Sequence, residues 1–303
     1  MSQPKTRRPA PPPGLLVVDK PPGMTSHDVV ARVRRIMGTR KVGHAGTLDP
    51  MATGVLVLGV ERATKLLGHL ALDRKTYLAT LALGVSTTTD DAEGEHLSTA
   101  DPDALAAVTD EAIASGIAAL TGEIQQVPSA VSAVKIAGKR AYARVRAGEE
   151  VALKPRPVTV YRFDLLATRR VADRIELDAV VECSSGTYVR ALARDLGEAL
   201  GVGGHLAALR RTTVGPFGIA AARTLEQLEE KPELSFDLDD AVAAAFPRYE
   251  VDAATARAVR YGQQVRASGI EGTYGVFDPD GHALALAVDA GGVARSVVVL
   301  APA

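Results

Sequence analysis

Residues 43–54 of the chain, GHAGTLDPMATG, are the stretch that decides the fold. Glycines at positions 43, 46 and 54 and the lack of a sustained hydrophobic period are typical of a loop. Asp49 lies directly before Pro50, which disfavours the α conformation and predicts extended or turn backbone for the carboxylate. A carboxylate held in this way can act as a nucleophile or base, or it can merely hydrogen-bond its own turn. The loop alone leaves both interpretations open.

Regular elements are predicted on both sides of this loop. The apolar runs 14–19 and 55–60 predict buried strands, and Ser26 is the expected N-cap of a helix over residues 27–37. Further helices are predicted over 62–70, 103–120 and 187–200, further strands over 75–85, 129–135, 158–167 and 174–183, and a polar loop over 86–97. Strands and helices that mix without strict alternation predict an α+β fold rather than a doubly wound sheet.

The length of 303 residues suits either one large domain or two smaller ones. Residues 1–13 are Pro-rich and basic and are expected to be a disordered tail. Near residue 246 the pattern changes to short strand-like pieces, namely TYGVF, ALALAV and RSVVVL. We therefore expect a main domain over 14–245 and a small β-rich domain over 246–303. The acidic segment 226–240 is either their boundary or a surface helix.

The net charge of −1 hides an uneven distribution. Residues 1–50 hold nine basic and three acidic residues, a second basic stretch spans 135–156, and acidic residues gather at 90–95 and 226–240. One basic and one acidic face would suit a protein that binds a polyanion. Charge alone leaves ordinary solvated helix faces as an equal interpretation. Aromatic residues make up 4% of the chain and tryptophan is absent, so few side chains could stack on a base.

Several classes of protein are excluded by what the sequence lacks. Cys183 is the single cysteine, so no disulfide can form within the chain and no cysteine cluster can bind zinc. No apolar run reaches the roughly 18 residues that span a bilayer, and no signal peptide is visible, so we expect a cytoplasmic protein. Neither GxGxxG nor GxxxxGK[ST] follows a strand, which argues against a generic nucleotide-binding enzyme.

The loop GHAGTLDPMATG, preceded by DKP at 19–21, resembles the signature of the TruB family of tRNA pseudouridine synthases. Similar blocks follow in the expected order: KTY at 75–77, SAVSAVKIAGKRAY at 129–142, SSGTYVRALARDLG at 184–197 and HLAALRRTTVGPF at 205–217. The resemblance covers residues 14–217. It implies the pseudouridine synthase fold, a mixed, largely antiparallel sheet flanked by helices. Related families that act on ribosomal RNA carry arginine where this chain has Thr47, which points to the tRNA branch.

The resemblance also implies the catalytic residues. Asp49 matches the catalytic aspartate of the family, whose reaction cuts the N1–C1′ bond of a uridine, turns the base and rejoins it through C5. Arg190 matches the arginine that pairs with this aspartate, which would lower the pKa of the carboxylate and fix its direction. Tyr77 matches the tyrosine that stacks on the target base, and Tyr188 matches a second tyrosine with a supporting role. Without the resemblance, Tyr77 would be interpreted as a half-buried strand residue.

Further contacts to the RNA follow from the same blocks. A uridine within a folded loop must leave its stack, which costs a few kcal/mol, and His44 matches the family's histidine near the vacated space. Leu206 matches an apolar residue that lines the pocket, although a core leucine is an equal interpretation. The candidates for phosphate or pocket contacts are Lys20, Arg40, Lys41 and Lys135.

The resemblance thus implies isomerisation of uridine 55 in the TΨC loop of tRNAs, without cofactor or metal, by a chain that binds the T arm. We expect a monomer, with residues 14–245 as the catalytic domain and 246–303 as a PUA-like RNA-binding domain. One alternative is an RNA-binding protein that helps tRNA to fold without chemistry. Another is a guide-RNA-dependent pseudouridine synthase. The polar segment 87–110 and the helix after it resemble the insertion of the stand-alone bacterial enzymes, which favours the first interpretation.

Overall fold

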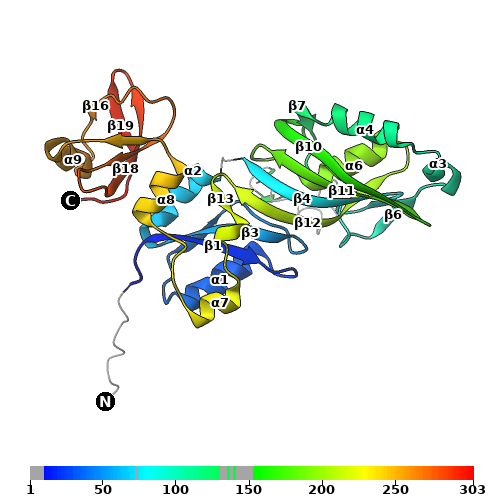
Figure 1. Cartoon of the computed structure of the whole chain (residues 1–303), viewed down its shortest axis with the longest axis horizontal. Coiled ribbons are helices and arrows are strands. Elements are labelled where there is room, and N and C mark those ends of the chain that lie inside the picture. The colour runs from blue at the N-terminus through cyan, green and yellow to red at the C-terminus, as the bar shows by residue number, and fades with distance from the viewer. Residues whose placement is uncertain (1–9, 72–73, 130–134, 137–138, 141–152) are drawn as a thin grey trace, which may run out of the picture. The chain divides into compact units, whose positions relative to one another are not determined.

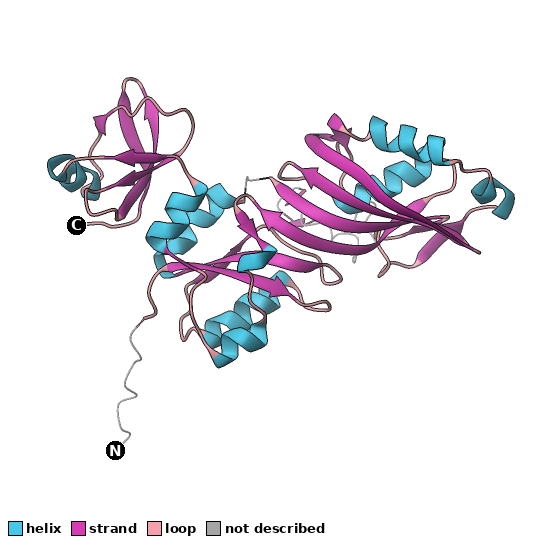
Figure 2. Ribbon diagram, in the orientation of Figure 1, coloured by secondary structure: helices cyan, strands magenta, loops and turns pink. Residues whose placement is uncertain are grey.

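The computed structural model describes residues 10–71, 74–129, 135–136, 139–140 and 153–303 (Figure 1). The chain divides into two compact units. The first comprises Met1–Pro50, Gly54–Ala71 and Val214–Ala303, and the second comprises Met51–Thr53 and Leu72–Thr213. Each unit contains both strands and helices (Figure 2), which confirms the predicted α+β class. No helix in the described ranges is long and apolar enough to cross a membrane.

The first unit is built around two buried antiparallel strands. β1 (Gly14–Lys20) pairs with β3 (Thr53–Val60), and Leu16 lies opposite Leu58. Both strands are buried along almost their whole length, as their continuous apolar runs predict. β14 (Phe236–Asp237) pairs with β1, and β2 (Val42–Ala45) pairs with β3. β2 lies within the segment that the sequence suggested to be entirely loop, so that part of the prediction was wrong.

The first long helix, α1, spans Ser26–Ile36, but its N-cap is Thr25 and not the predicted Ser26. The Thr25 hydroxyl accepts from the Asp28 amide, and the Asp28 carboxylate accepts from the Thr25 amide, which together form a capping box. These hydrogen bonds from Thr25 lower the pKa of Asp28. Ser26 is buried, and its hydroxyl is used for a contact far along the chain that is described below.

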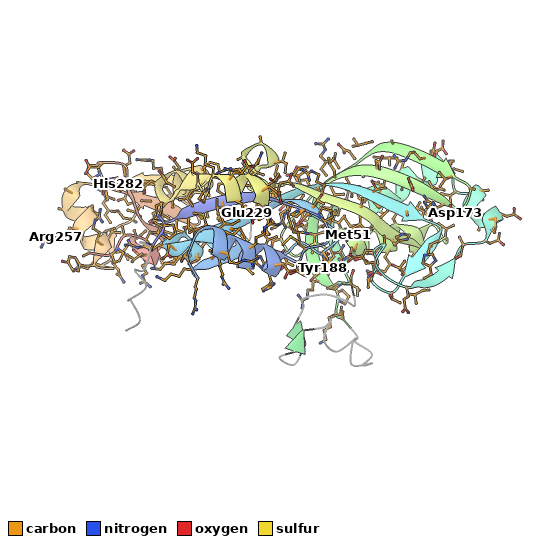
Figure 3. The ribbon with its side chains drawn as sticks, turned by 90° about the horizontal axis from the view of Figure 1, so that it is seen from below. Met51, Asp173, Tyr188, Glu229, Arg257 and His282 are labelled. Atoms are coloured by element: carbon orange, nitrogen blue, oxygen red, sulfur yellow. The ribbon has the colours of Figure 1, made fainter. Side chains whose placement is uncertain are left out.

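The basic helix α1 contacts part of the acidic segment 226–240. That segment contains α7 (Leu225–Glu230) and the start of α8 (Leu238–Ala245). The Arg32 Nε donates to the Glu229 carboxylate over 2.8 Å, and Arg32 Nη2 lies 3.4 Å from Glu226 (Glu229 is labelled in Figure 3). One arginine of the first basic stretch is thus paired with two carboxylates of the acidic segment, and the two interpretations of the charge distribution stay open.

The C-terminal part of the first unit is a five-stranded sheet. Its strand order is β15-β17-β18-β19-β16, and only the β15–β17 pair is parallel. The bounds are β15 Arg248–Glu250, β16 Val265–Arg266, β17 Tyr274–Phe277, β18 Ala283–Ala290 and β19 Val293–Val299, with α9 at Ala253–Arg260. The three longest strands overlap the three strand-like pieces that the sequence suggested, and each piece extends beyond its strand by at most one residue.

This C-terminal sheet shares a hydrophobic core with the N-terminal strands. Phe277, Leu286 and Leu300 belong to the same buried cluster as Leu15 and Val57. The contact is reinforced by η1 (Glu61–Leu66), which precedes α2 (Leu67–Leu70). Within η1, two basic side chains donate to carbonyls at the end of β19: Arg62 to Leu300 and Lys65 to Val299. Removal of the last strand would therefore open a core that the first strand also needs.

The second unit is a sheet with helices packed on it. Its strands lie in the order β12-β4-β11-β10-β7, and the pairs β4–β11, β11–β10 and β10–β7 are antiparallel. The strand bounds are β12 Gly204–Val214, β4 Lys75–Leu83, β11 Arg174–Cys183, β10 Arg156–Val171 and β7 Gly122–Gln126. The helices are α3 Pro102–Ala106, α4 Asp110–Ala119 and α6 Val189–Ala199. This arrangement agrees with the predicted largely antiparallel sheet flanked by helices.

Three predictions for this unit need correction or fall outside its description. The single helix expected over 103–120 is two helices, because Thr109 caps α4 by accepting from the Ala112 amide. The expected loop 86–97 contains β5 (Val85–Thr87) and the start of β6 (His96–Thr99). The strand expected over 129–135 lies mostly outside the described residues. β8 (Lys135–Ile136) and β9 (Lys139–Arg140) pair with each other.

Candidate active site

In the first unit, the main chain on the C-terminal side of Asp49 is held by a buried lysine. Lys20 ends β1, is 0% exposed, and donates through Nζ to the carbonyls of Pro21 (2.8 Å), Met24 (2.6 Å) and Pro50 (3.1 Å). The Gly23 amide donates to the same Pro50 carbonyl over 2.9 Å. The ammonium therefore ties the turn after β1 to the residue that directly follows Asp49.

The main chain on the other side of Asp49 is held by a buried serine. Ser26 Oγ donates to the Leu48 carbonyl (3.1 Å) and accepts from the Leu48 amide (2.8 Å). Both neighbours of Asp49 are thus fixed to elements that lie more than twenty residues earlier in the chain. A carboxylate on such a backbone is positioned before any substrate arrives, so little reorganisation is needed during a reaction.

The burial of Lys20 bears on its predicted contact with RNA. A phosphate contact would require the ammonium to reach solvent, yet it is fully buried and donates to three carbonyls. An ammonium has three hydrogens, and moving it to a phosphate would leave those carbonyls without this donor. These contacts tie Lys20 to the loop of Asp49, and its predicted phosphate or pocket contact with RNA stays a prediction.

His44 lies in the same unit as Asp49, on the strand that leads into the loop. β2 places it opposite Leu58 of β3, and its half-buried ring meets the ring of His27 edge to face, with 5.3 Å between centroids. His27 itself is exposed at the start of α1. The structure thus brings Lys20, His44 and the Asp49 loop together through contacts within one unit.

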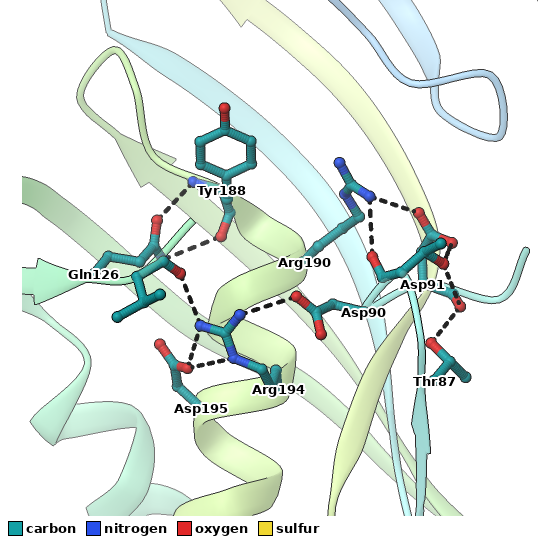
Figure 4. A network of polar contacts seen from close by, with 10 residues as sticks. Thr87, Asp90, Asp91, Gln126, Tyr188, Arg190, Arg194 and Asp195 are labelled. Atoms are coloured by element: carbon teal, nitrogen blue, oxygen red, sulfur yellow. Dashed lines mark hydrogen bonds and ion pairs between the residues drawn. The ribbon is translucent and has the colours of Figure 1, made fainter. Parts of the chain in front are cut away.

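In the second unit, Arg190 is part of a buried charge network (Figure 4). Its Nη1 donates to the Thr89 carbonyl (2.9 Å) and to Asp91 Oδ2 (3.1 Å). The Arg190 and Asp91 side chains are only 6% and 4% exposed. The Glu93 amide and the Thr89 hydroxyl both donate to the other Asp91 oxygen. A buried pair of this kind is tolerated because its charges are compensated and hydrogen-bonded.

The main chain of Leu206 anchors the acidic side of this network. The Leu206 amide donates to the Asp90 carbonyl (2.9 Å), and its carbonyl accepts from the Ala92 amide (3.0 Å). The Leu206 side chain is fully buried. Leu206 therefore fixes, through its backbone, the turn that carries the aspartate facing Arg190.

The main chain of Tyr188 is held by Gln126, a residue that the sequence did not suggest. The Tyr188 amide donates to Gln126 Oε1 (2.8 Å), and Gln126 Nε2 donates to the Tyr188 carbonyl (3.1 Å). Gln126 is 1% exposed and ends β7. One side-chain amide thus holds both polar groups of the peptide chain at Tyr188, which is the N-cap of α6 and lies two residues before Arg190.

The other two predicted residues of this unit lie on strands. Tyr77 lies in β4 opposite Val181, and its side chain is 7% exposed. Lys135 lies in β8 opposite Arg140. Burial of the Tyr77 ring agrees with the strand interpretation of this residue, and its proposed stacking on a base stays a prediction.

Asp91 was missed because its partners are far away in the sequence. The acidic run 90–95 suggested a solvated loop, whereas Asp91 forms its ion pair with a residue 99 positions later. A usable signal was present, since two adjacent aspartates occur in a chain whose predicted helix 187–200 carries arginines four residues apart. Among the residues that the structure describes, no group of three or more His, Cys, Asp or Glu side chains is arranged to hold a metal ion.

We expect Asp91→Asn to lower the free energy of unfolding by about 3 kcal/mol, at the low end of the range for breaking a buried pair, because the Thr89 carbonyl still faces Arg190. Urea denaturation measures this change. Asp110→Asn is the matched control, since Asp110 pairs with Arg170 at an exposed site. The control should lose less than about 1 kcal/mol. Equal losses of unfolding free energy in the two variants would show that the buried Asp91–Arg190 pair stabilises the fold no more than an exposed ion pair.

Comparisons with known proteins cover almost the whole chain. The model described as "TruB family pseudouridylate synthase (N terminal domain)" matches residues 34–189. The models "tRNA pseudouridylate synthase B C-terminal domain" and "tRNA Pseudouridine synthase II, C terminal" match residues 190–242 and 246–301. The three matches follow one another in chain order.

Individual proteins are similar over nearly their full length. The tRNA pseudouridine synthase B of Nocardia farcinica is 62% identical over 297 residues, which are 98% of this chain and 96% of that protein. The protein of the same name from Rhodococcus jostii is 60% identical over 291 residues, covering 96% and 94%. Among solved structures, a chain from the crystal structure of a Cbf5-Nop10-Gar1 complex superposes with a TM-score of 0.71 at 27% identity, covering 95% of this chain and 85% of that one.

Proposed function

The chain belongs to the TruB family of tRNA pseudouridine synthases, and from this premise we propose that it converts uridine 55 of the TΨC loop to pseudouridine, with Asp49 as the catalytic carboxylate. It is an isomerase whose substrate is tRNA. The observation that carries the assignment of Asp49 is the double clamp on its loop. Lys20 holds the Pro50 carbonyl and Ser26 holds the main chain of Leu48, so the backbone that carries Asp49 is held on both sides.

The reaction breaks the bond between N1 of uracil and C1′ of ribose and forms a bond between C5 and C1′. The proton on C5 is lost and N1 gains one, so the atoms balance without an oxidant, a reductant or a second substrate. Asp49 attacks C1′, attacks C6 of the base, or removes a proton from the sugar. Each route requires an ionised carboxylate, and we assign Arg190 as the positive charge that favours this form.

The remaining residues of the site are proposed to hold the flipped nucleotide. Extrusion of a loop base costs a few kcal/mol, and stacking on an aromatic ring returns about 1–3 kcal/mol per base. We assign this stacking to Tyr77, with Tyr188 as a supporting residue and His44 near the space that the base vacates. Recognition of the T arm would rest on its folded shape and its unstacked bases, which is how proteins commonly read RNA.

The test is pseudouridine formation on an unmodified tRNA transcript by the purified chain, with EDTA present and no added cofactor. We expect modification of uridine 55, and none on a matched transcript with cytidine at that position. Tight tRNA binding without modification would instead support a role in tRNA folding. Modification only after a guide RNA is added would support the guide-dependent alternative. The same preparation tests by sedimentation whether the chain is a monomer, as we propose.

A further inference from the structure

Helix α6 presents two arginines to two adjacent aspartates. Arg190 and Arg194 are four residues apart and so share one face of the helix. Arg190 pairs with Asp91 over 3.1 Å, and Arg194 Nη1 pairs with Asp90 Oδ2 over 2.9 Å (Figure 4). Arg190 is proposed to favour the ionised form of Asp49, whereas the Asp90–Arg194 pair has no part in that proposal.

The position of Asp90 indicates what this pair does. Arg190 Nη1 donates to the Thr89 carbonyl and to the Asp91 carboxylate, which are the residues on either side of Asp90. Asp90 has φ +59°, in the left-handed region that residues other than glycine rarely adopt. Its conformation therefore sets where both acceptors of Arg190 lie. Three contacts hold it there: its own amide donates to the Thr87 carbonyl, the Leu206 amide donates to its carbonyl, and Arg194 donates to its carboxylate. The contact with Arg194 is the one that reaches its side chain.

Arg194 also reaches the strand end that fixes Tyr188. Its Nη2 donates to the Val127 carbonyl over 2.8 Å and to Asp195 Oδ1 over 2.7 Å. Val127 directly follows Gln126, whose amide holds the main chain of Tyr188. The guanidinium thus joins three segments that are distant in sequence: the turn at Asp90, the end of β7, and α6 itself.

The electrostatic surroundings keep Arg194 charged. Its side chain is only 19% exposed, and burial opposes its charge, but Asp195 and Asp90 hold its pKa above the usual value. Burial raises the pKa of Asp195, and Arg194 offsets only part of that effect. A guanidinium suits this position because it can donate to several acceptors at once in fixed directions.

We propose that Arg194 is a positioning residue for pseudouridine formation, acting through Asp90 on the guanidinium of Arg190 and through Val127 on Tyr188. This inference rests on the proposed function. Loss of the Arg194 contact releases Asp90 from its left-handed conformation, which displaces the Thr89 and Asp91 acceptors and with them Arg190. We expect the displacement to act mainly on the chemical step, because recognition of the T arm is assigned to its folded shape and unstacked bases.

The test compares kcat, KM and thermal stability of four variants on the tRNA transcript. Arg194→Met and Asp90→Ala should each lower kcat about tenfold, since small misplacements of catalytic groups can cost up to 10²-fold. KM should stay within twofold. Asp90→Asn should lose less than threefold, because asparagine tolerates the left-handed conformation and still accepts from Arg194. Arg194→Met combined with Asp90→Ala should be no slower than Arg194→Met alone, since Arg194→Met already removes the contact with Asp90.

The matched control is Arg170→Met, which removes an exposed pair with Asp110 in the same unit and should keep the kcat of the unchanged protein. Unchanged kcat in folded Arg194→Met would overturn the inference, as would equal losses in Asp90→Ala and Asp90→Asn. If Arg194→Met does not fold, the comparison of Asp90→Ala with Asp90→Asn tests the positioning role instead. Inactivity of the unchanged protein would refute the proposed function, whereas full activity of the variants refutes only the positioning role.

Discussion

Asp49→Asn is expected to abolish pseudouridine formation while leaving tRNA binding within about threefold. The amide is nearly the same size as the carboxylate but carries no charge, so it can neither attack the nucleotide nor remove a proton. The rate should fall by at least about 10³-fold, within the range attributed to a positioned acid or base. The clamps on Leu48 and Pro50 involve main-chain atoms only and should survive the substitution. Rates are measured by tritium release from C5, and binding by filter retention.

The control for this prediction is Asp28→Asn, which changes another aspartate of the same unit. Asp28 belongs to the capping box of α1, and its side chain is exposed. The substitution should lower stability slightly and leave the rate unchanged. Pseudouridine formation by Asp49→Asn at more than about a hundredth of the normal rate would contradict the assignment of Asp49 as nucleophile or base.

Lys20→Met is expected to lower the free energy of unfolding by about 2–4 kcal/mol, because buried carbonyls that lose their donor cost about 1–3 kcal/mol each and some will regain water. Methionine fills most of the volume, so the loss reports the polar contacts of the ammonium, including the hydrogen bonds to Pro21, Met24 and Pro50, rather than a cavity. The turnover of the remaining folded protein should also fall, since the main chain next to Asp49 is no longer held. Urea denaturation and single-turnover rates measure the two effects.

Lys65→Met is the matched control, because Lys65 also donates to a carbonyl of its own unit but does so from an exposed position. It should lose no more than about 0.5 kcal/mol, as most surface substitutions do. Similar losses for the two lysines would mean that the burial of Lys20 has no energetic consequence. A normal rate in folded Lys20→Met would show that Asp49 does not need the clamp.

The sequence predicted helices and strands well where the residues within the element are enough to determine it. β1 and β3 are continuous apolar runs and were placed within two residues of their observed bounds. The helix cap was misplaced by one residue because Ser26 and Thr25 are both good capping residues. Only the tertiary structure shows that Ser26 Oγ is committed to Leu48, which leaves Thr25 to cap the helix. β2 was missed because its glycine hides the alternation of a strand.

Residues of the candidate site were predictable where they lie within a sequence motif. Residues that contact the motif from a distant part of the sequence were not. The motifs suggested Asp49, Tyr188 and Arg190, but not the residues that position them. Gln126 acts on a residue 62 positions away, and Asp91 on one 99 positions away. Their types alone predict surface residues, because isolated Gln and Asp are usually solvated. The burial of Lys20 was not predictable for the same reason, since its three carbonyl partners belong to the turn after β1 and to the loop of Asp49.

The discontinuous first unit has a consequence for the order of events during translation. Leu15 and Leu300 lie in one core, yet a ribosome adding about 5–20 residues per second makes them roughly 15–60 s apart. The whole second unit, Met51–Thr53 and Leu72–Thr213, is synthesised within that interval. It can therefore fold on the nascent chain while the N-terminal strands still wait for their partners. We expect a message that ends early, soon after residue 213, to yield a chain with the residues of the second unit but without Leu286 and Leu300 of the core that contains Leu15 and Val57.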